Sequence, residues 1–245
     1  MTIIRSLLFS QFTDIDFGLS TKYGLNRIAP HYFNTSMSVE DNLVNVEENR
    51  NAFYAFFCLD KSKIALQKQE HTDIITRVEK PGFVGESDAM ITDKPNIGII
   101  VSTADCGNIF IYDKINKVIA GIHSGWKGTY KRIVYKTVEI LKSEYNCKPD
   151  NLYIYLGPSI SKESFEVKED VSVLFESKYK HYLNSKIYID LPKYNIDMLV
   201  EHNIPLANIQ KSELCSFREA NLLHSYRRDG KYSGRAFGLI VLRGK

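Results

Sequence analysis

The sequence predicts a mixed-sheet α/β or α+β protein that forms a single domain over residues 1–245. Short apolar runs of strand length are interleaved with segments of helix length, and some neighbouring runs are joined by turns of hairpin length. The chain contains no Pro/Gly/Ser-rich linker, no shift in composition and no internal repeat, which favours one domain over two. At 245 residues it can bury most of its surface without a disulfide or metal staple.

The expected strands are apolar runs bounded by turn-forming residues. In chain order they are Ser6–Gln11, Lys63–Gln69, Ile74–Val78, Ile97–Thr103, Asn108–Tyr112, Val118–His123, Leu152–Leu156 and Ala236–Leu242. The expected helices are Val46–Leu59, Thr129–Tyr145, Asp170–Ser177 and Pro192–Glu201. The second helix has the clearest pattern, because Ile133, Thr137 and Leu141 share one face and Asn146 stands where a helix would stop.

Composition excludes several classes of partner. With 44% hydrophobic and 25% charged residues the chain is typical of soluble globular proteins. A net charge of +3 is too small to indicate a nucleic-acid partner. The apolar start Met1–Ser10 is too short and too interrupted for a signal peptide or a membrane span. Four scattered cysteines without a C-x-x-C pattern favour reduced thiols, and we therefore expect a cytoplasmic protein, with homo-oligomerisation left open.

Two strand ends carry reactive side chains. Cys106 follows the run Ile97–Thr103, and His123 ends the run Val118–His123, with one strand–turn–strand unit between them. A thiolate and an imidazole at neighbouring strand ends suit a metal such as zinc or a Cys–His nucleophile pair. His71, at the polar end of another expected strand, is the best candidate for a third ligand. Three protein ligands would leave a fourth position open, as in catalytic zinc sites.

Simpler readings of these residues stay open. A single His is more often a hydrogen-bonded structural residue than a ligand, and a single Cys at a strand end is often a small core residue. Near the C-terminus, Arg227 and Arg228 lie beside Gly230, an arrangement that suits an anion site for phosphate or carboxylate. The dipeptide Asp229-Gly230 equally favours a polar hairpin turn between two strands.

Common cofactor motifs are absent from the sequence. It has no G-x-G-x-x-G, Walker P-loop, H-E-x-x-H or G-x-S-x-G motif. The zinc deaminase pattern of H-x-E with P-C-x-x-C is missing as well. A P-loop or nucleotide-cofactor enzyme is therefore not expected.

Taken together and in order, a set of short segments resembles the YfiH/YlmD family, also called the laccase-domain or multicopper polyphenol oxidase family. The resemblance spans nearly the whole chain. Its segments are Gly18-Leu19-Ser20, Asn34, Glu47-Glu48-Asn49-Arg50, Gln69-Glu70-His71, Ser87-Asp88-Ala89-Met90-Ile91-Thr92, Thr103-Ala104-Asp105-Cys106, His123-Ser124-Gly125-Trp126-Lys127-Gly128-Thr129, Leu156-Gly157-Pro158-Ser159-Ile160, and Ser225-Tyr226-Arg227-Arg228-Asp229 with Gly234-Arg235.

The resemblance implies a single layered-sandwich domain with mixed sheets flanked by helices. It implies that His71, Cys106 and His123 hold one catalytic zinc ion per chain. The implied activity is phosphorolysis of adenosine or inosine to the free base and ribose 1-phosphate, with methylthioadenosine cleavage and adenosine deamination as associated activities. Arg50 is our first candidate for binding phosphate, Arg228 the second, and Asn34 is the candidate for contacting the sugar or base.

The oxidase name of the family does not fit the number of histidines that this chain offers as copper ligands. Several copper ions require many histidines, and the chain has six. The four outside the proposed metal site are His31, His181, His202 and His224, and none of them forms an H-x-H pair. We therefore expect no multicopper site. Departures from the family pattern include Asn108 in place of a proline, Lys127 in place of an arginine, and His224 in place of an aromatic residue.

Three functions compete at this point. The first is the zinc-dependent purine nucleoside enzyme. The second is a metal-free amidase or hydrolase with Cys106 as nucleophile and His123 as its base, for which a peptidoglycan precursor is one substrate. The third is a non-catalytic partner protein with a vestigial pocket. Metal content separates the first two, because chelation should not harm a thiol nucleophile whereas alkylation should.

Overall fold

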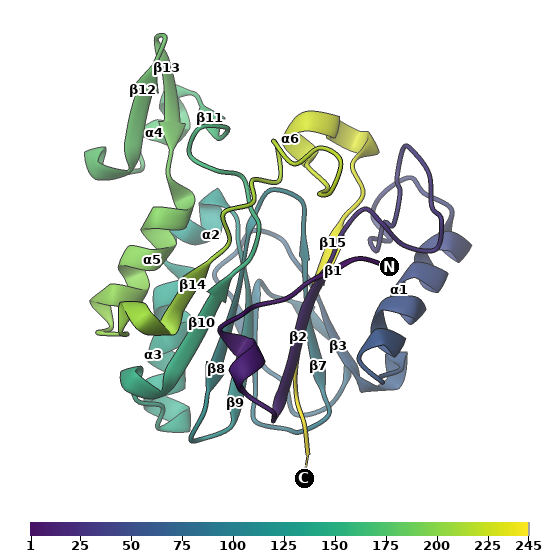
Figure 1. The fold of residues 1–245 in the computed structure, drawn as a ribbon. Helices are drawn as coiled ribbons and strands as arrows, with labels where there is room; N and C mark the ends of the chain where they lie inside the picture. Colours follow the sequence, from purple (N-terminus) through teal and green to yellow (C-terminus); the bar gives the residue numbers. More distant parts are fainter. Residues whose placement is uncertain (245) are drawn as a thin grey trace.

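The computed structural model describes residues 1–244 as a layered sandwich (Figure 1). Sheet A has the strand order β1 (Ile3–Ile4), β2 (Ile15–Ser20), β15 (Ala236–Leu242), β7 (Gly98–Thr103), β3 (Ile64–Lys68) and β5 (Gly82–Glu86). Sheet B has the order β14 (Ile209–Lys211), β10 (Leu152–Leu156), β8 (Gly107–Asp113), β9 (Val118–Ser124), β6 (Ala89–Thr92) and β4 (Ile75–Arg77). Both sheets mix parallel and antiparallel pairs, as the sequence predicted.

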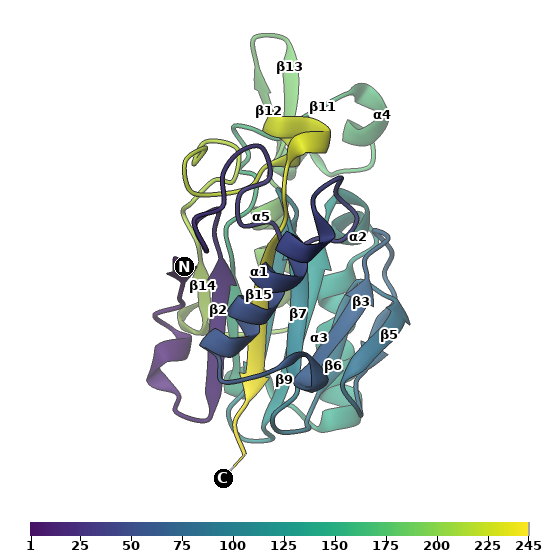
Figure 2. The same cartoon turned by 90° about the vertical axis from the view of Figure 1, so that its right-hand side faces the viewer.

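Helices cover both outer faces of the sandwich. α1 (Leu43–Phe56) crosses the outer face of sheet A, as the turned view in Figure 2 shows. α3 (Ile133–Tyr145) and α5 (Leu191–Glu201) cover the outer face of sheet B. Among residues 1–244, no helix combines the length and apolar character needed to cross a bilayer. The layered sandwich with mixed sheets and flanking helices is confirmed.

The core is divided by the sheets. Phe17, Val101 and Phe110 belong to the layer of apolar side chains between sheets A and B. β9 is buried along its whole length, because Ile119 faces sheet A while Ile122 faces the helices. Strands buried on both faces appear in sequence as continuous apolar runs, which is why β7, β8 and β9 could be predicted.

A small sheet projects from one end of the sandwich (Figure 1). It consists of β11 (Glu166–Val167), β13 (Lys186–Ile189) and β12 (Lys180–Leu183). Phe165, Phe175 and Ile189 form a separate apolar cluster beneath it. These strands lie in a polar stretch of sequence, and the sequence analysis did not predict them.

Near the chain termini, one predicted strand is wrong and one alternative that the sequence left open is not found. The expected strand Ser6–Gln11 is a turn that ends in the 3₁₀ helix Phe9–Gln11, because the Ser6 hydroxyl accepts a hydrogen bond from the backbone N–H of Phe9. The strands at this end are β1, just before this segment, and β2, further along the chain. The hairpin turn that Asp229-Gly230 left open as an alternative is instead the short helix α6 (Tyr226–Asp229), which Ser225 caps, followed by the 3₁₀ helix Gly230–Tyr232.

The helices differ from the predicted ones mainly at their ends. The expected helix Thr129–Tyr145 is divided into α2 (Trp126–Tyr130) and α3, since Arg132 takes a left-handed conformation between them. The expected helix Asp170–Ser177 shrinks to α4 (Glu169–Ser172), because the chain then turns to bury Phe175. α1 begins three residues before its prediction, where the Asn42 side chain accepts hydrogen bonds from two backbone N–H groups.

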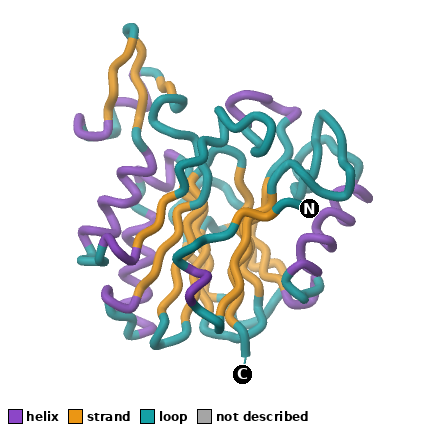
Figure 3. Tube along the Cα trace, in the orientation of Figure 1, coloured by secondary structure: helices purple, strands orange, loops and turns teal. Residues whose placement is uncertain are grey.

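The loops that carry the candidate site gather at the end of the sandwich opposite the C-terminus (Figure 3). β3, β7 and β9 end there, while β6 and β8 begin there, as their pairing directions require. Cys106 therefore lies where the chain passes from sheet A to sheet B. The sandwich brings the ends of both sheets to one place.

Beside these loops, His224 is a buried histidine whose imidazole is neutral in the folded chain. Burial lowers its pKa to about 3, although Nε2 lies 3.4 Å from the Phe33 carbonyl. In the unfolded chain the same group takes up a proton near pH 6.5, so the stability falls as pH drops from about 6.5 towards 3.

We predict that His224→Phe weakens this acid dependence. Between pH 7.5 and 5 the wild-type protein should lose about 2 kcal/mol more of its free energy of unfolding than the variant. Urea unfolding at both pH values measures the difference. His181→Gln, which changes an exposed histidine, should keep the wild-type dependence. Equal losses in wild type and His224→Phe would refute the assignment.

Candidate metal centre

Three side chains that are distant in sequence converge at the loop end of the sandwich. His71 lies beyond the end of β3, Cys106 directly precedes β8, and His123 lies in β9. One nitrogen of each histidine and the Cys106 sulfur all lie within 4.8 Å of one another. The two imidazole rings have centroids 4.8 Å apart. The structure thus brings together the three residues that the sequence nominated as metal ligands.

A buried carboxylate, Asp88, organises two of these residues. Its Oδ1 accepts a hydrogen bond from Nδ1 of His123 at 2.7 Å and one from the backbone N–H of His71 at 3.1 Å. Its Oδ2 accepts from the backbone N–H of Thr72 at 2.6 Å, from the Thr72 hydroxyl at 2.7 Å and from the backbone N–H of Glu70 at 3.3 Å. Sequence analysis gave Asp88 no role, and its position just before a buried strand was the only signal.

The electrostatics of this pair follow from its hydrogen bonds. Burial raises the pKa of Asp88, but the bonds from His123 and Thr72 outweigh it and lower the pKa to about 2. Burial lowers the pKa of His123, but the Cys106 sulfur and the Asp88 carboxylate outweigh it and raise the pKa to about 9. Because Asp88 occupies Nδ1, the other ring nitrogen of His123 is left for Cys106 or a metal ion.

Separate contacts hold the His71 loop and the Cys106 loop. The Gln69 amide bonds both backbone groups of Ser102, at 2.8 and 2.7 Å, and so attaches the His71 loop to β7. His71 itself has a left-handed backbone with φ 57°. Next to Cys106, the Asp105 carboxylate accepts hydrogen bonds from the Ser216 hydroxyl and the Arg227 backbone N–H, both at 2.6 Å. The backbone of each ligand loop is therefore fixed without using the ligand atoms.

Gly125 leaves the space that the ligands occupy. A Cβ atom at this position would lie 2.5 Å from Nδ1 of His71 and 3.0 Å from the Cys106 sulfur. Its backbone angles are ordinary for any residue, with φ −70°. Glycine is therefore needed here for space and not for conformation.

A single zinc ion fits these donors. In a tetrahedral site the nitrogen and sulfur ligand atoms lie about 3.4–3.6 Å apart, so the three groups need to close by only about 1 Å. His–Cys–His is a donor set that zinc accepts, and a histidine ligand normally donates its other N–H to a carboxylate, as His123 does to Asp88. His71, Cys106 and His123 could therefore hold a metal ion.

The candidate metal centre opens onto a cleft of about 820 Å³ on the outer face of sheet A. Leu66, Ile100 and Phe237 form its apolar part. Phe83 and Tyr226, both largely exposed, also line it. Two arginines, Arg50 from α1 and Arg235 from the segment before β15, supply positive charge. The cleft thus combines a candidate metal site with apolar, aromatic and cationic surfaces.

Of the predicted substrate-binding residues, only Arg50 lines this cleft. The Asn34 amide is used inside the protein, because Nδ2 donates to Ser36 and Asp41 and Oδ1 accepts from the backbone of Ser36 and Arg235. A direct contact between Asn34 and a nucleoside would need these hydrogen bonds to open. Arg235, which lines the cleft, lies in the Gly234-Arg235 segment, and the sequence did not single it out for substrate binding.

Arg228 is placed away from the cleft. Its guanidinium donates to the carbonyls of Ser216, Phe217 and Leu223 and forms an ion pair with Asp229. Each of its three guanidinium nitrogens has a protein acceptor. The structure therefore gives Arg228 a role in holding the loop together, because no donor nitrogen is left to bind phosphate.

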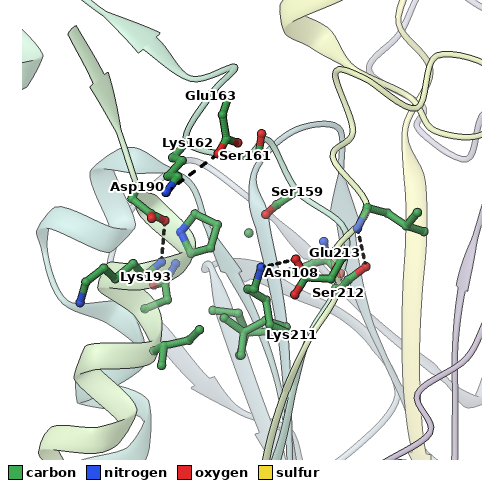
Figure 4. A pocket seen from close by; sticks show the side chains of 18 of the residues that line it. Asn108, Ser159, Ser161, Lys162, Glu163, Asp190, Lys193, Lys211, Ser212 and Glu213 are labelled. Carbon is green, nitrogen blue, oxygen red and sulfur yellow. Dashed lines mark hydrogen bonds and ion pairs between the residues drawn. The ribbon is translucent and has the colours of Figure 1, made fainter. Parts of the chain in front are cut away.

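A second pocket, of about 500 Å³, lies beside sheet B at the same end of the molecule (Figure 4). Its lysines have acidic neighbours, since Lys193 pairs with Asp197 and Lys211 with Glu213. Asn108, at the position where the family pattern has a proline, donates from Nδ2 to the Pro158 carbonyl at 2.7 Å. Within residues 1–244, the His, Cys and carboxylate groups that could hold a metal ion cluster at His71, Cys106 and His123 and not in this pocket.

The fold and the site together define a layered sandwich with a His–Cys–His centre at an open cleft. A family model described as "Multi-copper polyphenol oxidoreductase laccase" matches residues 16–243. The chain belongs to this family, the YfiH/YlmD family. It superposes on the crystal structure of the hypothetical protein YfiH from Bacillus licheniformis with a TM-score of 0.90, 25% identity, and coverage of 96% of this chain and 94% of that one.

Relatives within the family carry enzyme names. The chain is 34% identical over 216 residues to a purine nucleoside phosphorylase of Clostridium acetobutylicum, which covers 86% of this chain and 90% of the relative. It is 35% identical over 158 residues to adenosine deaminase RL5 from an unknown prokaryotic organism, covering 61% of this chain and 60% of the relative. At the level of the family, these names indicate purine nucleoside processing.

We predict that Asp88→Asn weakens zinc binding by roughly 10- to 100-fold. The variant keeps the size of the side chain, but the groups around both carboxylate oxygens are hydrogen-bond donors that the new amide NH₂ would repel. Competition with a chromogenic chelator measures the affinity. Asp73→Asn, which changes a half-buried carboxylate paired with Lys131 and Lys136, is the control and should bind zinc normally.

Gly125→Ala should also reduce zinc affinity by at least about tenfold, because the new methyl group would occupy the space between His71 and Cys106. Gly128→Ala in the same segment is the matched control, since its nearest contact would be 3.3 Å, to the Thr72 carbonyl. Isothermal titration with zinc compares the two proteins. Equal affinities for Gly125→Ala and Gly128→Ala would show that the ligands lie elsewhere.

Proposed function

We propose that this chain is a zinc-dependent purine nucleoside enzyme. It cleaves adenosine, inosine or methylthioadenosine with phosphate to give the free base and a ribose 1-phosphate, and it deaminates adenosine. The observation that carries the proposal is the cluster of His71, Cys106 and His123 in a cleft that two arginines also line. The names of the relatives support purine nucleosides as the substrate class, and adenosine for deamination.

His71, Cys106 and His123 would hold one zinc ion per chain. When bound, zinc supplies a Lewis acid that activates water or polarises a substrate atom at neutral pH. Asp88 orients the His123 ring through Nδ1, and Gln69 fixes the loop that presents His71. These contacts hold the ligands in place before the metal arrives, which lowers the cost of ordering them.

The two reactions make different demands on the cleft. In phosphorolysis a phosphate oxygen forms a bond to C1′ of the ribose while the bond from C1′ to the base breaks, and the base leaves with the electron pair and takes up a proton. Deamination adds water at C6 of the purine and releases ammonia, and it needs no phosphate. Arg50, which faces the cleft, is the residue we assign to phosphate.

Removing the metal should abolish both activities. After dialysis against a chelator, we expect phosphorolysis and deamination of adenosine to fall by at least about a hundredfold and zinc to restore them. Cys106→Ala should show the same loss without rescue, because it removes a ligand. Metal analysis of the purified protein, with base and inosine followed by chromatography, provides the measurement.

The metal-free Cys–His hydrolase makes the opposite prediction. In that case the apoprotein would keep its activity and a thiol reagent would remove it. Because Cys58 is exposed and would also react, the alkylation experiment is done on Cys58→Ser protein. Full activity of the metal-free protein, lost on alkylation of Cys106, would contradict the zinc enzyme.

A further inference from the structure

We propose that Arg50 and Arg235 form one phosphate site in the cleft, separate from the metal ligands, and that it serves phosphorolysis and not deamination. This inference rests on the proposed function for the identity of the reaction. The existence of the anion site itself rests on the arginines alone. Sequence analysis nominated Arg50 and Arg228 for this role, and the structure favours Arg235 as the second member.

The pairing of the arginines separates these two from the others. Within the part of the chain that the structure describes, five arginines lie within ion-pair distance of a carboxylate: Arg27, Arg77, Arg132, Arg228 and Arg243. Three without such a partner are exposed to solvent: Arg5, Arg218 and Arg227. Arg50 and Arg235 alone among residues 1–244 are partly buried arginines without a carboxylate partner.

A partly buried cation without a counter-charge is costly unless an anion joins it. Burial lowers the pKa of both guanidinium groups, yet an arginine stays protonated at neutral pH. Both side chains line the cleft that contains Cys106 and His123. Glu47 near Arg50 and Asp105 near Arg235 raise these pKa values only from beyond ion-pair distance. A direct counter-charge is therefore expected from a ligand in that cleft.

One short segment links the two arginines. Nε of Arg50 donates to the Thr35 carbonyl at 2.7 Å, while the Thr35 backbone N–H and hydroxyl donate to the Arg235 carbonyl at 3.0 and 2.8 Å. Oδ1 of Asn34 accepts from the Arg235 backbone N–H at 2.9 Å. Asn34 is thus a positioning residue for the anion site, which gives this predicted substrate residue a different role.

The donors that remain match an oxyanion. Across residues 1–244, neither terminal nitrogen of Arg50 donates to a protein acceptor, and Arg235 leaves Nε and Nη2 without one. Each guanidinium also lies over an aromatic ring, Arg50 over Phe237 at 5.1 Å and Arg235 over Tyr226 at 5.3 Å. These contacts limit the motion of two planar donor groups that can each bind phosphate through paired N–H bonds.

The chemistry of the ligand is that of a phosphate group. It could come from inorganic phosphate or from the phosphoryl group of a nucleotide, and we assign it to inorganic phosphate because phosphorolysis uses that as its nucleophile. Since deamination needs no phosphate, loss of either arginine should affect the two reactions unequally. This inequality separates an anion site from a general role in folding or metal binding.

The test compares Arg50→Gln and Arg235→Gln with Arg227→Gln as the matched control, since Arg227 is exposed and does not line the cleft. We expect each cleft variant to raise KM for phosphate by roughly 10- to 100-fold. Deamination of adenosine should stay within about threefold of wild type. Unchanged KM for phosphate, or an equal fall in both reactions, would overturn the proposal.

A binding measurement keeps the anion site testable if phosphorolysis itself is absent. Inorganic phosphate should raise the Tm of wild type and Arg227→Gln but not of Arg50→Gln or Arg235→Gln. If phosphate protects but no phosphorolysis occurs, the proposed function fails and the anion site stands. If adenosine 5′-monophosphate protects and inorganic phosphate does not, the assignment to free phosphate is wrong.

Discussion

The candidate site depends on one buried carboxylate. Asp88 receives hydrogen bonds from the His123 ring, from the Thr72 hydroxyl and from three successive backbone N–H groups of the His71 loop. Its own backbone also bonds the N–H of His123 and the carbonyl of Ile74. A single residue thus sets the position of one ligand loop and the orientation of a second ligand. Without the carboxylate, these donors would lose their common acceptor.

The layered architecture explains why the ligands come from distant parts of the chain. His71 belongs to the end of sheet A, His123 to the end of sheet B, and Cys106 to the crossover between them. The sheets are held together by apolar side chains between them, so the three ligand positions are fixed by the core and not by local sequence. Rigid strand ends can hold reactive groups in place while the neighbouring cleft stays open to a substrate.

Much of the site could be predicted from the sequence, because Cys106 follows and His123 ends a continuous apolar run, while His71 follows the polar end of an expected strand. β7, β8 and β9 are buried on both faces, so their sequences are continuous apolar runs that predict strands. The contributions of Asp88, Gln69 and Gly125 could not be derived, since each acts through a contact with a residue far away in sequence. The prediction of a strand at Ser6–Gln11 is wrong for a local reason. The Ser6 hydroxyl accepts a hydrogen bond from the Phe9 backbone N–H, which a strand would have paired with a neighbouring strand.

The arginines show the same limit. Arg228 and Arg235 both lie in a motif near the C-terminus, and nothing in their local sequence separates a structural arginine from one that faces a ligand. The difference appears only in three dimensions, where Arg228 finds three carbonyls and Asp229 while Arg235 faces the cleft. A partly buried arginine without a carboxylate partner indicates a ligand site, and the sequence alone does not reveal such an arginine.

The central claim is that His71, Cys106 and His123 bind one zinc ion. A crystal structure with data collected on both sides of the zinc absorption edge tests it most directly. We predict one anomalous peak per chain, about 2.3 Å from the Cys106 sulfur and about 2.0–2.1 Å from one nitrogen of each histidine. No peak in protein grown with zinc, or a peak bound by other residues, would contradict the account.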